Sequence, residues 1–163
     1  MAGNAGQAKQ LADLAKTLRQ TADGKVTLKR LRKELRQVAQ PMRKSVQRAA
    51  MGLPSDGESA RRGRPSLRRT LSRATRIKVT FARFTAGVMV VTGPGGMPDG
   101  MKGLPPYFEG GAPLRHPVFG NRDVWVRQQA APFFYPAIRP HEASVQAAAQ
   151  RVLDQITKEI EQS

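Results

Sequence analysis

The stretch TLKRLRKELRQVAQPM, Thr27 to Met42, decides the fold because it carries the strongest helical pattern in the first half of the chain. Its apolar side chains recur every three or four residues, so they share one side of a helix that must be buried. These positions are Leu28, Leu31, Leu35, Val38 and Met42. Cations occupy the other sides, at Lys29, Arg30, Arg32, Lys33 and Arg36. Thr27 is suited to cap the start, and Pro41 predicts a kink or an end.

One helix is predicted before this segment, and three strands and a further helix are predicted after it. A shorter amphipathic helix runs from Ala8 to about Ala22. Alternating apolar residues predict strands at RIKVTF, AGVMVVT and DVWVRQ, residues 76–81, 86–92 and 123–128. The last segment, from Pro140 onward, repeats apolar residues at helical spacing.

Together these elements predict an α+β fold with a long N-terminal helix, a small antiparallel β-sheet and a C-terminal amphipathic helix packed on the sheet, with extended loops. We expect a single domain overall. It comprises an N-terminal helical region over 1–50, a basic flexible loop over 51–72 that is rich in Gly, Pro, Ser and Arg, and an α+β core over 73–163. The apolar stripe of the last helix, which includes Val145, Val152, Leu153 and Ile156, favours a role in the core over a role in an interface.

Charge is concentrated in one part of the chain. Residues 25–83 hold 18 Lys and Arg against three Asp and Glu, a net of +15, out of +16 for the whole chain. Such an excess indicates a polyanionic neighbour, because unneutralised self-repulsion destabilises a compact state. Three interpretations remain open at this point: salt-dependent contact with a nucleic-acid backbone, docking on an acidic protein surface, or a solvated face.

Catalytic and cofactor patterns are missing from the sequence. The chain has no cysteine, which removes disulfides and thiolate metal ligands. Its two histidines, His116 and His141, lack metal-site spacing. The Gly-rich segment 95–103 has Met101 directly after Gly100, where a phosphate-binding loop has its lysine. We therefore expect no enzyme activity, no catalytic residue, no metal and no cofactor. The sequence also lacks a long apolar run, so we expect a soluble protein without membrane contact.

Aromatic residues gather in a second informative stretch, Arg115 to Ile138, which holds five of the chain's nine. Prolines stiffen it, and Trp125 lies on the predicted strand. We expect Trp125 and Phe133 to be inside the fold. The other three are expected partly at a subunit boundary: Phe119, Phe134 and Tyr135.

The order of these features resembles the tail-component, or tail-completion, family of long-tailed phages, and in particular members from phages and prophages of actinobacteria. The most specific pieces are RHPVFGNRDVWV (115–126) and PFFYPA (132–137), supported by the basic helix and by Tyr107 to Gly110. Many relatives read roughly EFGT where this chain has EGGA, residues 109–112.

The resemblance implies a structural virion protein of the phage neck, assembled in the host cytoplasm. It implies a homo-oligomeric, hexameric ring around the DNA channel, between head-completion (stopper) proteins and tail-terminator or tail-tube proteins. Cations would then face either the double-stranded genome, without sequence specificity, or an acidic partner protein. They are Lys29, Arg30, Arg32, Lys33 and Arg36 of the first long helix, and Arg61, Arg62, Arg64, Arg68 and Arg69 of the loop. The alternative is a free basic nucleic-acid-binding protein without enzymatic activity.

Overall fold

The computed structural model describes residues 3–20, 23–54, 66–82, 86–99, 102–111, 113–118, 121–129 and 131–162. The chain has an α+β fold, as predicted. It forms two compact units. Unit 1 comprises Met1–Arg43, Ile77–Val91 and His141–Ser163, and unit 2 comprises Lys44–Arg76 and Thr92–Pro140.

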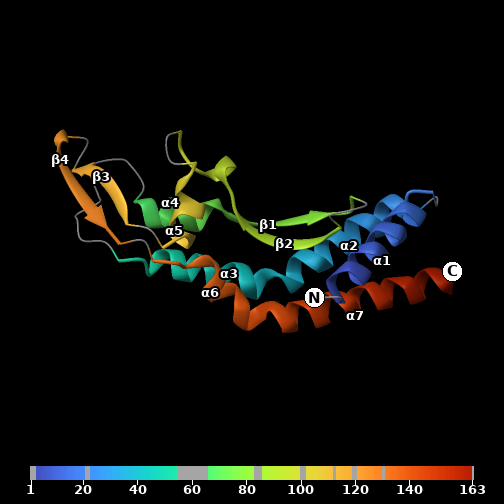
Figure 1. Cartoon of the computed structure of the whole chain (residues 1–163). Coiled ribbons are helices and arrows are strands. Elements are labelled where there is room, and N and C mark those ends of the chain that lie inside the picture. The colour runs from blue at the N-terminus through green and yellow to red at the C-terminus, as the bar shows by residue number, and fades with distance from the viewer. Residues whose placement is uncertain are drawn as a thin grey trace. The chain divides into compact units, whose positions relative to one another are not determined.

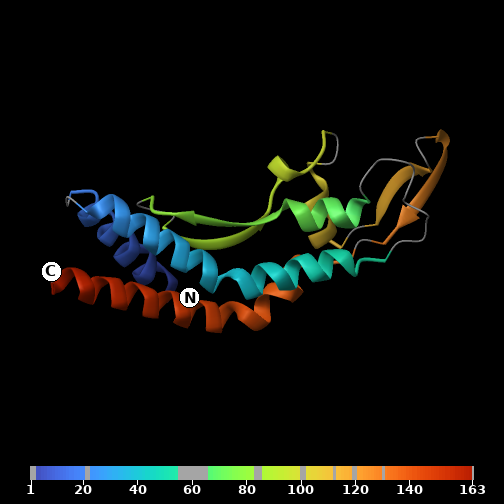
Figure 2. The ribbon, with the colours of Figure 1, turned by 180° about the vertical axis from the view of Figure 1, so that it is seen from behind.

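The helices of unit 1 are α1 (Gly3–Leu18), α2 (Gly24–Val38) and α7 (Glu142–Glu161). It also contains most of the paired strands β1 (Thr75–Thr80) and β2 (Gly87–Thr92). Helix α2 packs against both α1 and α7. Figures 1 and 2 show α7 along one side of α2 and the two strands along the other. The core joins all of these elements through Leu11, Ala15, Leu31, Leu35, Phe81, Ala86, Leu153 and Ile156.

The periodic pattern predicted this core correctly. Leu31 and Ile156 are fully buried, and Leu153 is nearly so, which confirms the inward stripes of α2 and α7. Val79 and Val88 from the strands pack against the same cluster, so the C-terminal helix shares its core with the sheet. The break at Pro41 is also confirmed, because α2 ends at Val38 and the next helix, α3 (Gln40–Met51), takes the proline into its first turn.

Unit 2 contains short elements: α4 (Leu67–Ala74), η1 (Pro94–Gly96), α5 (Leu104–Glu109), β3 (Leu114–Val118), β4 (Asn121–Gln128), α6 (Phe134–Ile138) and η2 (Arg139–His141), of which the last continues to His141 in unit 1. Strands β3 and β4 form an antiparallel pair of their own, so the strands among the described residues lie in two two-stranded sheets. The strand predicted at 123–128 therefore pairs with β3 and not with the first two.

Helix α4 corrects the predicted loop over 51–72, which is wrong at residues 67–72. Ser66 caps the helix by accepting a hydrogen bond from the Arg69 amide at 3.4 Å. Leu71 and Ala74 are then buried by helical spacing. The beginning of the stretch also differs, because α3 continues to Met51. Residues 55–65 lie outside the described part of the chain.

Candidate polyanion-binding surface

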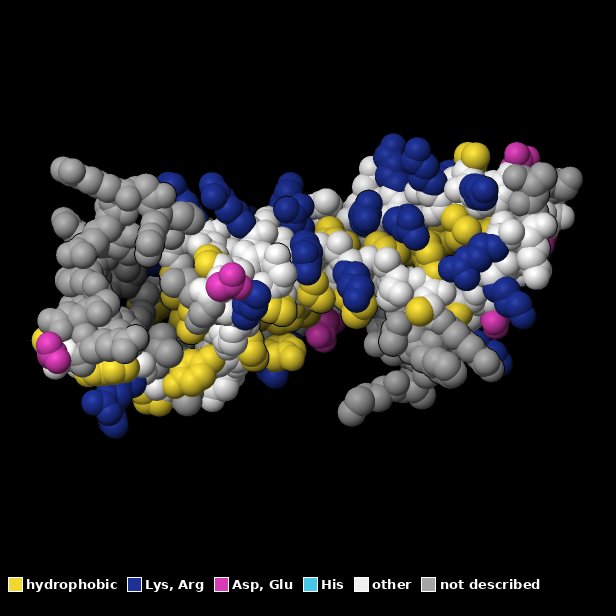
Figure 3. All heavy atoms as spheres, turned by 90° about the horizontal axis from the view of Figure 1, so that it is seen from above, with side chains coloured by type: hydrophobic (Ala, Val, Ile, Leu, Met, Phe, Trp, Pro, Cys, Tyr) yellow, Lys and Arg dark blue, Asp and Glu magenta, His cyan; other side chains and the backbone are white. Residues whose placement is uncertain are grey.

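Five cations of α2 lie on one side of that helix. At about 100° of rotation per residue, all five fall within an arc of about 100° that contains no Asp or Glu. We call them the α2 stripe: Lys25, Lys29, Arg32, Lys33 and Arg36. Each is exposed. To the right in Figure 3, where unit 1 lies, Lys and Arg side chains stand out from the surface with few carboxylates among them.

Arg32 is held in place at this surface by an aromatic ring. Its guanidinium carbon lies 5.2 Å from the centroid of Phe81, which is itself buried in the core of unit 1. A cation over an aromatic face is attracted by the ring quadrupole. The contact leaves Arg32 exposed to solvent while restricting where its charge can be.

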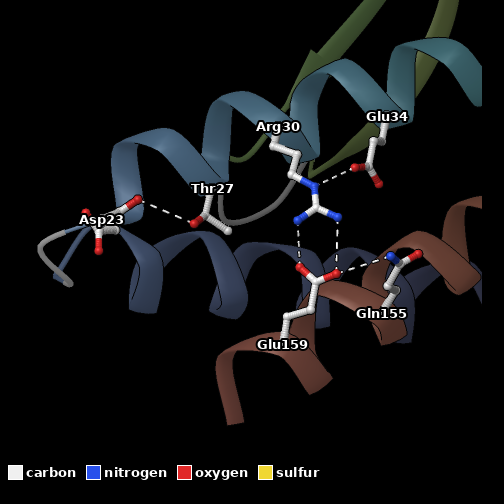
Figure 4. A network of polar contacts seen from close by, with 6 residues as sticks. All are labelled: Asp23, Thr27, Arg30, Glu34, Gln155 and Glu159. Atoms are coloured by element: carbon white, nitrogen blue, oxygen red, sulfur yellow. Dashed lines mark hydrogen bonds and ion pairs between the residues drawn. The ribbon is translucent and has the colours of Figure 1, made fainter. Parts of the chain in front are cut away.

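Arg30 is the exception among the predicted cations, since it points away from the stripe and binds carboxylates of its own unit (Figure 4). Its Nε donates to Glu34 at 2.8 Å, one turn along α2. Its two terminal nitrogens donate to the two oxygens of Glu159 on α7, at 2.7 and 3.1 Å. This fork fixes α7 against α2. It also keeps both carboxylates occupied on the side of α2 opposite the stripe.

The pKa values of this pair move in the directions that an ion pair requires. The hydrogen bonds to Glu34 and then to Glu159 raise the pKa of Arg30. The hydrogen bond from Arg30, followed by one from Gln155, lowers the pKa of Glu159 below its ordinary 4.5. Because the pKa of Glu159 is lower in the folded state, the pair stabilises the fold above about pH 4.5 and this stabilisation is lost as the pH falls through the lowered pKa.

Replacing Glu159 by glutamine is therefore expected to reduce stability modestly at neutral pH, since exposed ion pairs contribute little. The difference from the wild-type chain should vanish as the pH falls below 4.5 toward the lowered pKa. Urea unfolding across that range measures it. Glu161→Gln removes the same charge from the exposed end of α7 and serves as the control. A pH-independent difference at position 159 would show that the carboxylate charge is not what holds α7.

The remaining predicted cations are distributed differently. Arg68 and Arg69 lie on α4 in unit 2, where Arg69 is exposed and Arg68 is half-buried. Arg61, Arg62 and Arg64 lie outside the described residues. The structure therefore brings four of the predicted cations together, Lys29, Arg32, Lys33 and Arg36, and adds Lys25 to them.

The predicted aromatic residues divide between the core and the surface. Phe133 is 3% exposed, as predicted, and meets Phe108 edge to face with ring centroids 6.4 Å apart. The prediction for Trp125 is wrong, because its side chain is 46% exposed. Strand β4, which carries Trp125, pairs with β3 alone among the described strands. The guanidinium carbon of Arg115 lies 5.2 Å from the centroid of the indole ring.

The other aromatic residues of the stretch are less buried. Phe134 is half-buried and meets Tyr135 edge to face, and the Tyr135 side chain is 57% exposed. Exposure is what a contact with a neighbouring subunit requires, and that contact stays a prediction. Phe119 lies outside the described residues.

Glu109 organises the aromatic stretch, and sequence reasoning missed it. One carboxylate oxygen accepts hydrogen bonds from the amides of Phe133 and Phe134, at 3.0 and 2.8 Å. The other accepts from the amide of Tyr135 at 3.3 Å. The preceding residue, Phe108, packs on Phe133, so α5 binds the start of α6 through both an apolar contact and a carboxylate. Two sequence motifs that looked independent, YFE and PFFY, thus form one structural unit.

The described residues contain neither a cluster of metal ligands nor a helix that could span a membrane. Within them, no cluster of three or more His, Asp or Glu side chains is placed to bind a metal ion. The helices of that same part of the chain are too short or too polar to cross a membrane.

In comparisons with known proteins, no family model, curated protein or solved structure matches the chain.

Proposed function

We propose that this chain is a structural protein of the phage neck, which forms a homo-oligomeric ring around the DNA channel between head-completion and tail proteins. The observation that carries the proposal is the α2 stripe, a surface of cations without carboxylates on a well-packed helical unit. A protein that surrounds a passing genome, or that docks on an acidic ring, needs such a surface.

The aromatic stretch gives the proposal a second support. Two of the segments that carry the resemblance to tail-completion proteins, Tyr107 to Gly110 and PFFYPA, contain the residues through which α5 binds the start of α6. These residues hold two helices together, so their resemblance to the family is more specific than a resemblance in charge alone. The exposed Trp125 and Tyr135 then provide apolar area for contact between neighbouring subunits.

Deleting the gene from the parent phage tests this function. We expect DNA-filled heads and tails that fail to join, or tails of defective length, when lysates are examined by electron microscopy. Supplying the wild-type chain from a plasmid should restore normal particles. Infectious particles formed at the normal rate without the chain would contradict the proposal.

The second candidate, a free nucleic-acid-binding protein, is favoured by the same stripe. Electron micrographs of the purified chain separate the two functions. Rings support the neck role, whereas a monomer that binds DNA tightly and with a steep salt dependence supports the free binder.

A further inference from the structure

We infer that the α2 stripe binds the phosphate backbone of double-stranded DNA, and that it does so without reading the sequence. The inference rests on the proposed function only for the source of the DNA, because the surface itself is defined by Lys25, Lys29, Arg32, Lys33 and Arg36.

The stripe carries charge at a density comparable to that of a DNA duplex. From residue 25 to residue 36 the helix rises about 17 Å, at 1.5 Å per residue. Over the same length, one strand of a B-form duplex presents about five phosphates, at 3.4 Å each. The stripe and the duplex therefore carry opposite charge at a comparable density along their axes, five cations against about five phosphates on each strand. Anchoring of Arg32 over Phe81 reduces the conformational freedom that such binding would otherwise cost.

The composition of the stripe distinguishes a phosphate backbone from an acidic protein. Lysine is depleted at the centres of protein interfaces, where aromatic and apolar side chains supply most of the affinity. Three of the five stripe residues are lysines, and the arc contains no aromatic residue. The nearest large exposed apolar side chain of α2 is Val26, at the edge of the arc. Phosphates, in contrast, need only cations.

Nearby carboxylates do not compete for the stripe. Glu34 of α2 and Glu159 of α7 are both bound by Arg30, on the other side of α2 (Figure 4). The stripe is thus cationic along its whole length, and counterions released from the duplex would drive binding. The arc has no aromatic ring to stack on bases and no Asn or Gln to read adenine, and cations that follow a backbone bind phosphates, which carry no sequence information.

The test measures binding of the full chain to short DNA duplexes of two unrelated sequences at several salt concentrations. The stripe variant carries Lys29→Gln, Lys33→Gln and Arg36→Gln. The control variant carries Lys9→Gln, Lys16→Gln and Arg19→Gln, two exposed cations of α1 and one in the turn that follows it, and has the same net charge as the stripe variant. Circular dichroism and thermal melting establish that both variants fold as the wild type does.

We expect the wild-type chain to bind both duplexes equally. Losing three phosphate contacts should flatten the slope of log affinity against log salt by about 3. Raising the salt from about 50 to 200 mM weakens the affinity of both proteins for DNA. The factor by which it falls should be about 40 times smaller for the stripe variant than for the wild-type chain. The control variant should retain the wild-type slope.

Three results would overturn the inference: no duplex binding by the wild-type chain, equal changes in the two variants, or tighter binding to poly-glutamate than to DNA at equal charge. The last would identify an acidic protein as the partner. Failure of the proposed neck role would be distinguishable from failure of this inference. It would appear as normal phage assembly after gene deletion, whatever salt dependence of DNA binding the variants show. If deletion blocks assembly and the stripe variant still binds DNA as the wild type does, only the inference about the stripe fails.

Discussion

Replacing Gly96 by alanine is expected to destabilise unit 2 by about 3 kcal/mol, the upper end of typical overpacking costs. A Cβ at this position would lie 2.7 Å from the Cα of Ala74 and 2.9 Å from its Cβ. Neither atom can move aside easily, because Ala74 is the buried last residue of α4, which packs on η1. The close approach of two backbones is therefore what requires glycine here.

Gly95→Ala is the matched control for this substitution, in the same short 3₁₀ turn. Its Cβ would approach the guanidinium of Arg76 at 3.2 Å, and the end of a long side chain can shift at little cost. Urea unfolding should place the control near the wild-type chain and Gly96→Ala well below it. Equal stability of the two variants would mean that η1 does not lie against Ala74 as described.

Replacing Glu109 by alanine should also cost about 3 kcal/mol. Three backbone amides lose a charged acceptor, two of them partly buried, and hydrogen bonds to charged groups contribute about 1.5–3 kcal/mol each. The full sum is not expected because water can reach the amide of Tyr135. Loss of the carboxylate should free the start of α6 and the aromatic residues beside it.

Glu109→Gln separates the charge from the contact. The amide keeps one oxygen acceptor, so it should retain part of the stability that alanine loses. Unfolding free energies of the two variants, with Glu142→Ala as an exposed control, measure the difference. Wild-type stability of Glu109→Ala would show that the three amides do not depend on this carboxylate.

The parts of the fold that the sequence could predict are those encoded by the periodicity of apolar residues within a single segment. Helix α2, the inward stripe of α7 and the strands β1 and β2 follow from periodicity within each segment. Helix α4 carried a signal too, in Ser66 and the spacing of Leu71 and Ala74, but its arginines and the serine- and glycine-rich residues before it favoured a loop.

Contacts between distant residues explain what the sequence could not predict. Glu109 lies 24 residues before the first amide that it binds, and Arg30 lies 129 residues before Glu159. Neither partner is marked by its neighbours in sequence. The error at Trp125 has a similar origin, because its exposure depends on β3 and β4 pairing only with each other among the described strands.

The α2 stripe shows how a charge pattern becomes a more specific hypothesis once the helix is placed. The sequence assigned all the cations of this helix to one role. The structure separates Arg30, which binds α7, from the five exposed cations on the opposite side. Within the basic segment of 59 residues, the structure thus defines one cationic surface on one side of α2, in addition to the exposed cations that α3, α4 and β1 carry.

The most direct test of the neck role is an electron cryomicroscopy reconstruction of the assembled phage particle. We predict a ring of this chain at the junction of head and tail, with Lys29, Lys33 and Arg36 facing the density of the packaged DNA. A particle whose neck is fully accounted for by other proteins, with this chain absent from it, would contradict the proposal.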